Sequence, residues 1–271
     1  MTDTLRARRP SAIPGTVYLV GAGPGDPGLL TVRALELIRN ADVVLHDHLV
    51  SPEILAECGD RTRLNDVGKV GHGPQADQAA IERQLIALAR AGRSVVRLKG
   101  GDPLLFGRGS EEASALRAAN VQFEIVPGVS SAMAAPAYAG IPLTARGIAA
   151  SVAIVTGHCA QSPAPAPVPA ADTIVVLMGV ANAAAVRDRT IAAGVGADTP
   201  VAVIEWGTCA HQRVATGTLG ALPAVIADAG LRAPAVIVIG EAVRLRSTLD
   251  WFDPVDSARS TLTEELVYET S

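Results

Sequence analysis

Residues 16–40 read TVYLVGAGPGDPGLLTVRALELIRN, and this stretch decides the fold class. It starts with a mainly apolar run at 16–20, passes through a turn with four glycines at 21–28, and continues as an amphipathic stretch at 30–40. A short apolar run without alternation is typical of a strand buried on both faces, and the apolar spacing that follows is typical of a helix covering it. The stretch therefore predicts a strand, turn and helix of a parallel sheet.

The same pattern recurs along the 271 residues. In the first half it predicts further strands at 42–46, 61–67, 94–98 and 122–126, and helices at 77–91 and 111–119. In the second half it predicts strands at 151–156, 173–178, 201–205 and 235–239, and an antiparallel strand at 212–218. We expect an α/β protein with two α/β domains, each built on a mainly parallel sheet. The predicted division is a flexible tail at 1–14, domains at 15–143 and 144–252, and a second tail at 253–271.

Composition disfavours several classes of protein. With 49% hydrophobic residues the chain is not a disordered protein. A formal net charge of -4 gives no basic field for nucleic acid, and no apolar run is long enough to span a membrane. Cys58, Cys159 and Cys209 form no closely spaced pair, which disfavours disulfides and a zinc site. We therefore expect a cytoplasmic protein without a metal, a nucleic-acid partner or a membrane anchor.

Unusual residues follow four of the predicted strands. Their loops are GAGPGDPG at 21–28, HDH at 46–48, KGGDP at 99–103 and PGVSS at 127–131. Ligands of parallel sheets bind outside the carboxyl ends of the strands, so we expect these loops to meet in one ligand site. For a single loop, tight turn geometry explains the glycines better than a ligand does; the ordered set favours a function.

The first loop does not fit a dinucleotide or a nucleoside triphosphate. The pattern G-x-G-x-x-G needs a third small residue where this chain has Asp26, and Pro24 has no backbone N–H for a phosphate. No G-K-[ST] motif is present either. A ligand with an adenosine part and a cationic centre suits carbonyl oxygens, carboxylates and a soft apolar wall, and S-adenosylmethionine has these features. Asp102 and Met178 are candidate contacts for it, although a Met at a strand end is more often a core residue.

Eight segments together resemble one protein family. They are VYLVGAGPGDPGLLT, DVVLHDHLVSPEI, VGK, VVRLKGGDPLLFGRG, VPGVSSAMAAPAYAGIPLT, VTGH, VLMGVAN and QRVATGTL, in this order. The set resembles the uroporphyrinogen-III C-methyltransferase family of tetrapyrrole methylases over residues 15–252. The resemblance implies two methyl transfers from S-adenosylmethionine to carbons 2 and 7 of uroporphyrinogen III, which give precorrin-2 for cobalamin or sirohaem and release S-adenosylhomocysteine. It also implies a homodimer with an active-site trough between the two domains.

The resemblance also assigns roles to residues of this chain. Asp47 corresponds to the proposed proton acceptor and Lys69 to the proposed proton donor. The positions that match cofactor contacts of the family are Pro24, Gly100, Gly101, Asp102, Leu105, Ser130, Ser131, Met178 and Gly207. The substrate carries eight carboxylates, and arginines suit them; our candidates are Arg33, Arg97, Arg108 and Arg146.

Two further residues bear on these roles. Lys69 and Lys99 are the two lysines of the chain, and the resemblance assigns a role only to Lys69. The role of Lys99 stays open; one interpretation is a charge at the edge of the site that attracts substrate carboxylates. Asp47 has a competing structural reading as a helix cap, but Ser51 before Pro52 is the better cap.

The chain departs from the family pattern in several places. Where the family commonly has YDR, this chain has His46, Asp47 and His48, and the family's arginine and histidine after Lys69 are replaced by Val70 and Pro74. The second domain carries a Pro/Ala tract at 161–171, predicted as an exposed loop. Two alternatives stay open: a methylase of the same fold acting on a later corrin precursor, and a non-catalytic nucleotide-binding module, which would need neither Asp47 nor Lys69.

Overall fold

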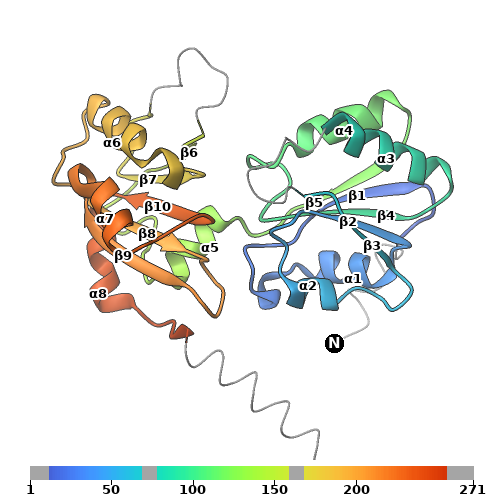
Figure 1. The fold of residues 1–271 in the computed structure, drawn as a ribbon, viewed down its shortest axis with the longest axis horizontal. Helices are drawn as coiled ribbons and strands as arrows, with labels where there is room; N and C mark the ends of the chain where they lie inside the picture. The colour runs from blue at the N-terminus through green and yellow to red at the C-terminus, as the bar shows by residue number, and fades with distance from the viewer. Residues whose placement is uncertain (1–11, 69–77, 159–167, 255–271) are drawn as a thin grey trace, which may run out of the picture. The chain divides into compact units, whose positions relative to one another are not determined.

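The chain divides into two compact units, Met1–Ser130 and Ser131–Ser271 (Figure 1). The computed structural model describes residues 12–68, 78–158 and 168–254 of them. The sequence placed the division later, between residues 143 and 144. The difference is helix α5 (Ser131–Tyr138), which packs on strands of the second unit and therefore belongs to it.

The first unit is built on a parallel sheet of five strands in the order β3-β2-β4-β1-β5. The strands are β1 (Thr16–Gly21), β2 (Val43–His46), β3 (Arg63–Asp66), β4 (Val95–Lys99) and β5 (Gln122–Val126). All five predicted strands are confirmed, with ends within two residues of the predicted ones. Every residue of β2 and β4 is buried, as continuous apolar runs in a parallel sheet predict.

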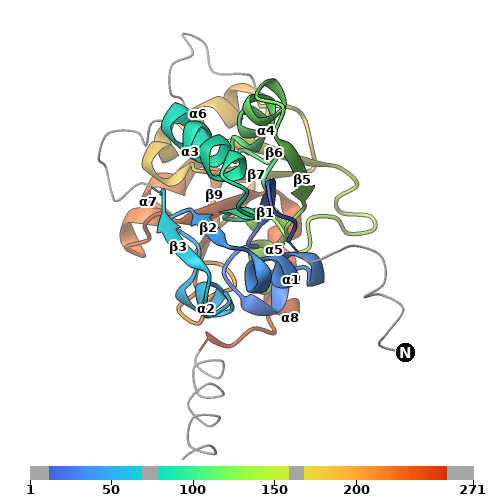
Figure 2. The ribbon, with the colours of Figure 1, turned by 90° about the vertical axis from the view of Figure 1, so that its right-hand side faces the viewer.

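Helices cover both faces of this sheet. They are α1 (Val32–Asn40), α2 (Pro52–Ala56), α3 (Gln78–Arg90) and α4 (Gly109–Ala118), with a short 3₁₀ helix at Pro27–Leu29. Figure 2 shows α1 and α2 on one side of the sheet and α3 and α4 on the other. The three helices predicted in this half are confirmed. α2 is an addition, and its first turn is capped by Ser51, whose hydroxyl accepts a hydrogen bond from the N–H of Ile54.

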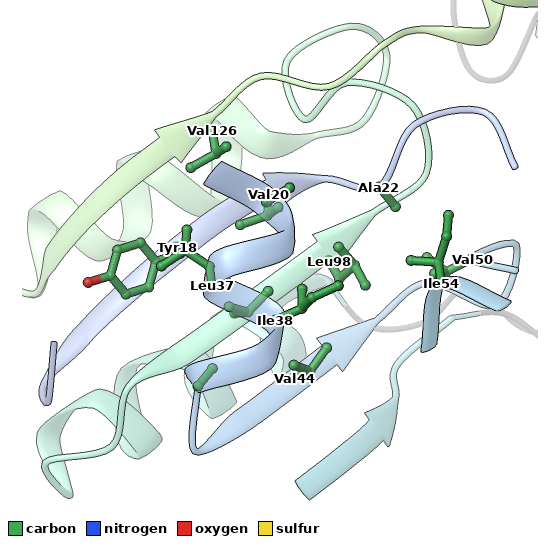
Figure 3. Packing of buried hydrophobic residues seen from close by; sticks show 13 residues of the cluster. Tyr18, Val20, Ala22, Leu37, Ile38, Val44, Val50, Ile54, Leu98 and Val126 are labelled. Carbon is green, nitrogen blue, oxygen red and sulfur yellow. The ribbon is translucent and has the colours of Figure 1, made fainter. Parts of the chain in front are cut away.

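A separate hydrophobic core lies on each face. On one face Leu37 and Ile38 of α1 pack with Val44 and Leu98 of the strands (Figure 3). On the other face, side chains of α3 and α4 such as Leu85 pack on β1, β2 and β4. Full burial of one such aliphatic side chain contributes about 1.5–3 kcal/mol, so the two cores fix the strands and therefore the loops that follow them.

The second unit contains a mixed sheet of five strands in the order β6-β7-β10-β8-β9. The strands are β6 (Val152–Thr156), β7 (Thr173–Leu177), β8 (Pro200–Glu205), β9 (Arg213–Thr218) and β10 (Ala235–Ile239). The antiparallel strand predicted at 212–218 is confirmed as β9. The prediction of a mainly parallel second sheet was wrong, because only β6 and β7 pair in parallel and the other neighbours are antiparallel. A buried apolar run has the same pattern in both directions, so the sequence of β10 did not reveal that it runs against its neighbours.

Helices α6 (Ala183–Ala192) and α7 (Leu222–Asp228) pack against the apolar core of this second sheet. α5 contacts β7 and β10, and α8 (Arg246–Leu249) follows the last strand. Short 3₁₀ helices lie at Val180–Asn182, Leu219–Ala221 and Glu241–Leu245. No helix in the described part of the chain is long and apolar enough to cross a membrane. The predicted tail at 1–14 and the tract at 161–171 lie mostly outside the described residues, and so does the tail at 253–271.

Candidate functional site

The loops after β1, β2, β4 and β5 meet at the carboxyl edge of the first sheet, as predicted. The N–H of Gly23 donates to the carbonyl of Gly101 (3.2 Å), and the N–H of Gly101 donates back to Gly23 (2.7 Å). The N–H of Gly128 donates to Asp102 Oδ2 (3.1 Å), and the N–H of Asp47 donates to the carbonyl of Leu98 (3.0 Å). Hydrogen bonds therefore join loops that are far apart in sequence into one surface.

Two kinds of glycine occur on this surface. A Cβ atom on Gly21 would lie 2.5 Å from Cα of Gly128, and one on Gly128 would lie 2.3 Å from the carbonyl oxygen of Gly101, so these glycines allow the loops to pack. Gly100 is different: it is exposed, and no atom of the described residues lies within 4 Å of a Cβ placed on it. Packing does not require a glycine at position 100, and its contact with a cofactor stays a prediction.

The other cofactor contacts predicted at residues 24–131 differ in burial and in hydrogen bonding. Both carboxylate oxygens of Asp102 accept backbone hydrogen bonds, from Leu104 (2.8 Å) and from Gly128 (3.1 Å). Asp102 therefore stabilises the conformation of the two loops that follow β4 and β5. Pro24 and Leu105 are half-buried. Ser130 is buried at the end of the β5 loop, and Ser131 is half-buried at the start of α5.

Asp47 follows β2 directly, and its side chain is 32% exposed. Its carboxylate accepts a hydrogen bond from the guanidinium of Arg97, which lies on the neighbouring strand β4. Ser51, not Asp47, caps α2. The competing structural reading of Asp47 as a cap is therefore wrong, and its carboxylate is both held by a cation and accessible.

Arg97 is buried, whereas a residue that binds the substrate must be accessible. Its side chain is only 3% exposed, and it donates to Glu112 Oε1 through Nε (3.1 Å) as well as to Asp47. The prediction of Arg97 as a ligand of substrate carboxylates does not fit this burial. Arg97 orients Asp47 instead.

Lys99 is also buried, with a side-chain exposure of 3%, and its ammonium donates to Glu112 Oε1 (3.1 Å). Burial lowers the pKa of Lys99 below its usual value, the charge of Arg97 lowers it further, and Glu112 and Asp47 oppose the shift. The interpretation of Lys99 as a charge at the edge of the site that attracts substrate carboxylates is therefore wrong. Glu112, which is completely buried and holds both cations, was not singled out from the sequence.

The other three predicted substrate arginines differ in availability. Arg33 on α1 is paired with Glu124 (3.0 Å) and Glu36 (3.2 Å) and is 17% exposed, which does not fit a free substrate ligand. Arg108 is exposed in the loop before α4 and forms a two-point pair with Glu111 (2.9 and 2.7 Å). Arg146 is exposed in the second unit. Arg108 and Arg146 therefore keep their predicted role as proposals.

The predicted proton donor, Lys69, lies outside the described residues. Gly68, the residue before it, packs tightly against the β2 loop, because a Cβ on Gly68 would lie 2.0 Å from the backbone nitrogen of His48. His48 Nδ1 lies 3.3 Å from Asp66 Oδ2, at the end of β3. The histidine that replaces the family's arginine is thus paired with an acid at the same edge.

In the second unit, Met178 and Gly207 follow β7 and β8. Both strands run antiparallel to β10 between them, so they end at the same edge of the sheet. Met178 is 50% exposed, so it is not a core residue, and it adopts the left-handed region with φ 56°. Trp206 and Thr208 beside Gly207 also have positive φ (48° and 76°), and such strained backbone is common at ligand sites. Gly207 itself has a packing role, since a Cβ there would lie 2.4 Å from Cβ of Ala135 in α5.

Residues 16–223 match the family model of the Tetrapyrrole (Corrin/Porphyrin) Methylases. The chain belongs to this family. The predicted family of tetrapyrrole methylases is thereby confirmed, together with the predicted class of enzyme, a methyltransferase.

Relatives of this tetrapyrrole methylase include siroheme synthase of Pseudomonas fluorescens (strain Pf0-1), which is 48% identical over 243 residues. The match covers 88% of this chain and 52% of that relative, so the chain spans about half the length of the curated relatives it matches. The chain is also similar to uroporphyrin-III-C-methyltransferase from Thermus thermophilus, known from a crystal structure, with 44% sequence identity and a TM-score of 0.76. The match covers 87% of this chain and 98% of the Thermus thermophilus chain.

A second Thermus thermophilus structure of this enzyme is complexed with S-adenyl homocysteine. It is 38% identical to the tetrapyrrole methylase described here, covers 85% of this chain and 99% of its own, and has a TM-score of 0.74. S-adenosylhomocysteine is what remains of S-adenosylmethionine after its methyl group has left. The complex therefore supports the predicted cofactor.

Proposed function

We propose that the protein transfers methyl groups from S-adenosylmethionine to carbons 2 and 7 of uroporphyrinogen III and so forms precorrin-2. The observation that carries the proposal is the carboxyl edge of the first sheet. There the exposed backbone at Gly100 lies in the same joined set of loops as Asp47, a half-buried, accessible carboxylate held by a cation. The similarity to uroporphyrin-III-C-methyltransferase over nearly that enzyme's whole length supports the substrate.

The residues of the chain fit S-adenosylmethionine. Gly100 and Gly101 lack side chains and so allow the cofactor to approach the backbone. Its polar groups can bind the backbone carbonyls and the carboxylate around Asp102. Its sulfonium can lie against a polarizable, exposed thioether such as that of Met178. When bound, the cofactor supplies an activated methyl group. The first unit and the second unit each contribute part of this set.

The chain's own contribution is positioning and proton transfer. A pyrrole carbon that gains a methyl group changes its conjugation, and a proton must leave the macrocycle. We propose that Asp47 accepts that proton. Where Lys69 protonates the rearranged macrocycle at another atom, a second proton leaves the macrocycle, so that one proton is lost for each methyl group gained. Arg108 and Arg146, both exposed, are proposed to bind substrate carboxylates through their forked donors.

Three further parts of the proposal rest on the family resemblance. We propose that the protein is a homodimer, that it works in the cytoplasm, and that its product enters the synthesis of cobalamin or sirohaem. Size-exclusion chromatography with light scattering tests the first: twice the chain mass supports it, and the chain mass alone contradicts it.

Product analysis tests the reaction. The protein is incubated anaerobically with S-adenosylmethionine and uroporphyrinogen III, and the tetrapyrrole is analysed by mass spectrometry. Two added methyl groups support the proposal. A protein that binds S-adenosylmethionine but methylates only a later corrin precursor would be the related methylase, and one that methylates neither would be a nucleotide-binding module.

A further inference from the structure

A buried cluster of charged residues lies behind Asp47. Glu112 on α4 is completely buried, and its Oε1 accepts hydrogen bonds from Arg97 Nε (3.1 Å), Lys99 Nζ (3.1 Å) and Gln78 Nε2 (3.3 Å). Arg97 then donates through Nη2 to Asp47. The cluster therefore links a fully buried carboxylate to the accessible one through a single guanidinium.

Arg97 has little freedom to move in this arrangement. Its Nη1 donates to the backbone carbonyls of Leu98 (3.2 Å) and Leu45 (3.4 Å), which belong to two neighbouring strands. With Glu112 on one side and Asp47 on the other, each nitrogen of the guanidinium has an acceptor. The direction in which Arg97 presents its Nη2 to Asp47 is thus set by the sheet and by Glu112.

Fold stability alone does not account for the cluster. Buried ion pairs are frequently no more stabilising than apolar residues of the same size, because the charges lose their hydration. Glu112 Oε2 is also buried, and no described residue donates a hydrogen bond to it, which adds a further cost. All the hydrogen bonds that the Glu112 carboxylate accepts from the described residues come from Gln78, Arg97 and Lys99, behind Asp47, which points to a role at Asp47.

We propose that Glu112 and Lys99 are positioning residues for the general base Asp47: Glu112 fixes Arg97, and Lys99 balances the charge of Glu112. The inference rests on the proposed function, because it needs Asp47 to accept the proton. In the folded cluster two cations face two carboxylates. Removing one buried charge leaves the other unbalanced, and the effect reaches Asp47 through Arg97 at hydrogen-bond distance.

The sign of the effect depends on which charge is removed. Without the carboxylate of Glu112, two cations face the carboxylate of Asp47 alone and favour its charged form, so the acid limb of the kcat profile is expected at lower pH. The pKa of Lys99 falls further in this variant, because Glu112 no longer opposes the effect of burial, so the shift of the limb is read at the acid end of the profile, where the Lys99 ammonium binds its proton. Without the ammonium of Lys99, two carboxylates share one guanidinium, so the acid limb is expected at higher pH. The other titratable or charged groups at this edge are unchanged in both variants: His46 and His48 beside Asp47, Asp66 on β3, Glu82 on α3, and Arg108 and Glu111 at the start of α4.

The experiment compares the pH dependence of kcat for the full chain and three variants, Glu112→Gln, Lys99→Met and the double variant. The acid limb is expected to move by about one pH unit to lower pH in Glu112→Gln and by about one unit to higher pH in Lys99→Met. In the double variant both buried charges are absent, so the limb is expected to return to its parental pH. KM for S-adenosylmethionine is expected to stay within about twofold of the parental value, since neither residue lies on the exposed surface of the loops.

Asp42→Asn is the matched control. Asp42 is a carboxylate of the same sheet, but it lies at the amino edge, where it accepts hydrogen bonds from the N–H (2.8 Å) and the hydroxyl (2.9 Å) of Ser94. Its loss is expected to lower the melting temperature without moving the acid limb. A purely structural role of Glu112 and Lys99 would give this same result in their variants.

The outcomes separate the two proposals. Opposite shifts in the single variants, cancelled in the double variant, support the positioning role. An unmoved limb in the folded variants overturns it, even where Asp47→Asn is inactive. If Asp47→Asn keeps the parental rate, the proposed general base is wrong and this inference fails with it. If one single variant does not fold, the other and the double variant decide.

Discussion

At the scale of single residues, Asp47 differs from Asp102 and Glu112 at the carboxyl edge because its half-buried carboxylate is reachable and is held by a buried guanidinium. Asp102 uses its two oxygens for loop hydrogen bonds, and Glu112 is completely buried. A general base must reach its proton and keep a fixed direction while it does so. Among these three carboxylates, Asp47 alone meets both conditions.

Asp47→Asn is expected to lower kcat by about 100-fold or more, the usual contribution of a general base, while the affinity for S-adenosylmethionine stays nearly parental. The amide oxygen of Asn can still accept the hydrogen bond of Arg97, so the local geometry is kept. Single-turnover kinetics and calorimetric titration of the cofactor measure the two quantities. A variant with close to parental turnover would rule out this role for Asp47.

A substitution at Gly100 can distinguish an effect on cofactor binding from an effect on packing. Gly100→Ala adds a methyl group that meets no described atom, so the melting temperature is expected to change by less than about 2 °C while cofactor affinity falls about tenfold or more. Gly92→Ala is the opposite case. Gly92 has φ 76° at the other end of β4, so its variant is expected to be less stable but to bind normally. Thermal unfolding and calorimetry of both variants give the comparison, and normal cofactor affinity in Gly100→Ala would remove Gly100 from the site.

At the scale of elements, α4 shows what the sequence could and could not predict. Its position and the loop before it were predicted, yet Glu111 and Glu112 stand side by side and look alike in the sequence. Glu111 is exposed and pairs with Arg108, whereas Glu112 points into the sheet toward Arg97 and Lys99. Adjacent helix positions face different directions, and only the packing of α4 decides which one is buried. Arg97 was misread for the same reason, since a basic residue near a glycine-rich loop resembles a surface ligand until its burial is known.

The contact between α5 and the β8 loop gives a prediction at this scale. Gly207→Ala would place its Cβ 2.4 Å from Cβ of Ala135, so the variant is expected to lose about 1–3 kcal/mol of unfolding free energy. The double variant Gly207→Ala with Ala135→Gly removes the contact between the two Cβ atoms but leaves Cα of Ala135 3.0 Å away and places a glycine in α5, so it is expected to recover part of the loss. Denaturant unfolding measures the stability, and cofactor binding is measured on the double variant. Weak binding that persists after stability is partly restored supports the predicted cofactor contact of Gly207, and normal binding leaves it a packing residue alone.

At the scale of the whole molecule, the first unit was predictable because strand and helix alternate in a parallel sheet and each strand end carries its own loop. The second unit was less predictable. The sequence located its apolar strands, but the direction of β10 and the unit to which α5 belongs depend on contacts between segments far apart in sequence. The cofactor contacts assigned by resemblance fall in both units. The proposed reaction therefore requires both units, with the proposed proton acceptor in the first.

The position of the new methyl groups tests the central claim most directly. The protein is incubated anaerobically with uroporphyrinogen III and S-adenosylmethionine labelled with ¹³C in its methyl group, and the product is examined by ¹³C NMR, with Asp47→Asn as the control. We expect two labelled methyl carbons, attached to carbons 2 and 7, and almost none with the control. Labelled methyl groups on other ring carbons, or none from a folded protein that binds the cofactor, would contradict the account.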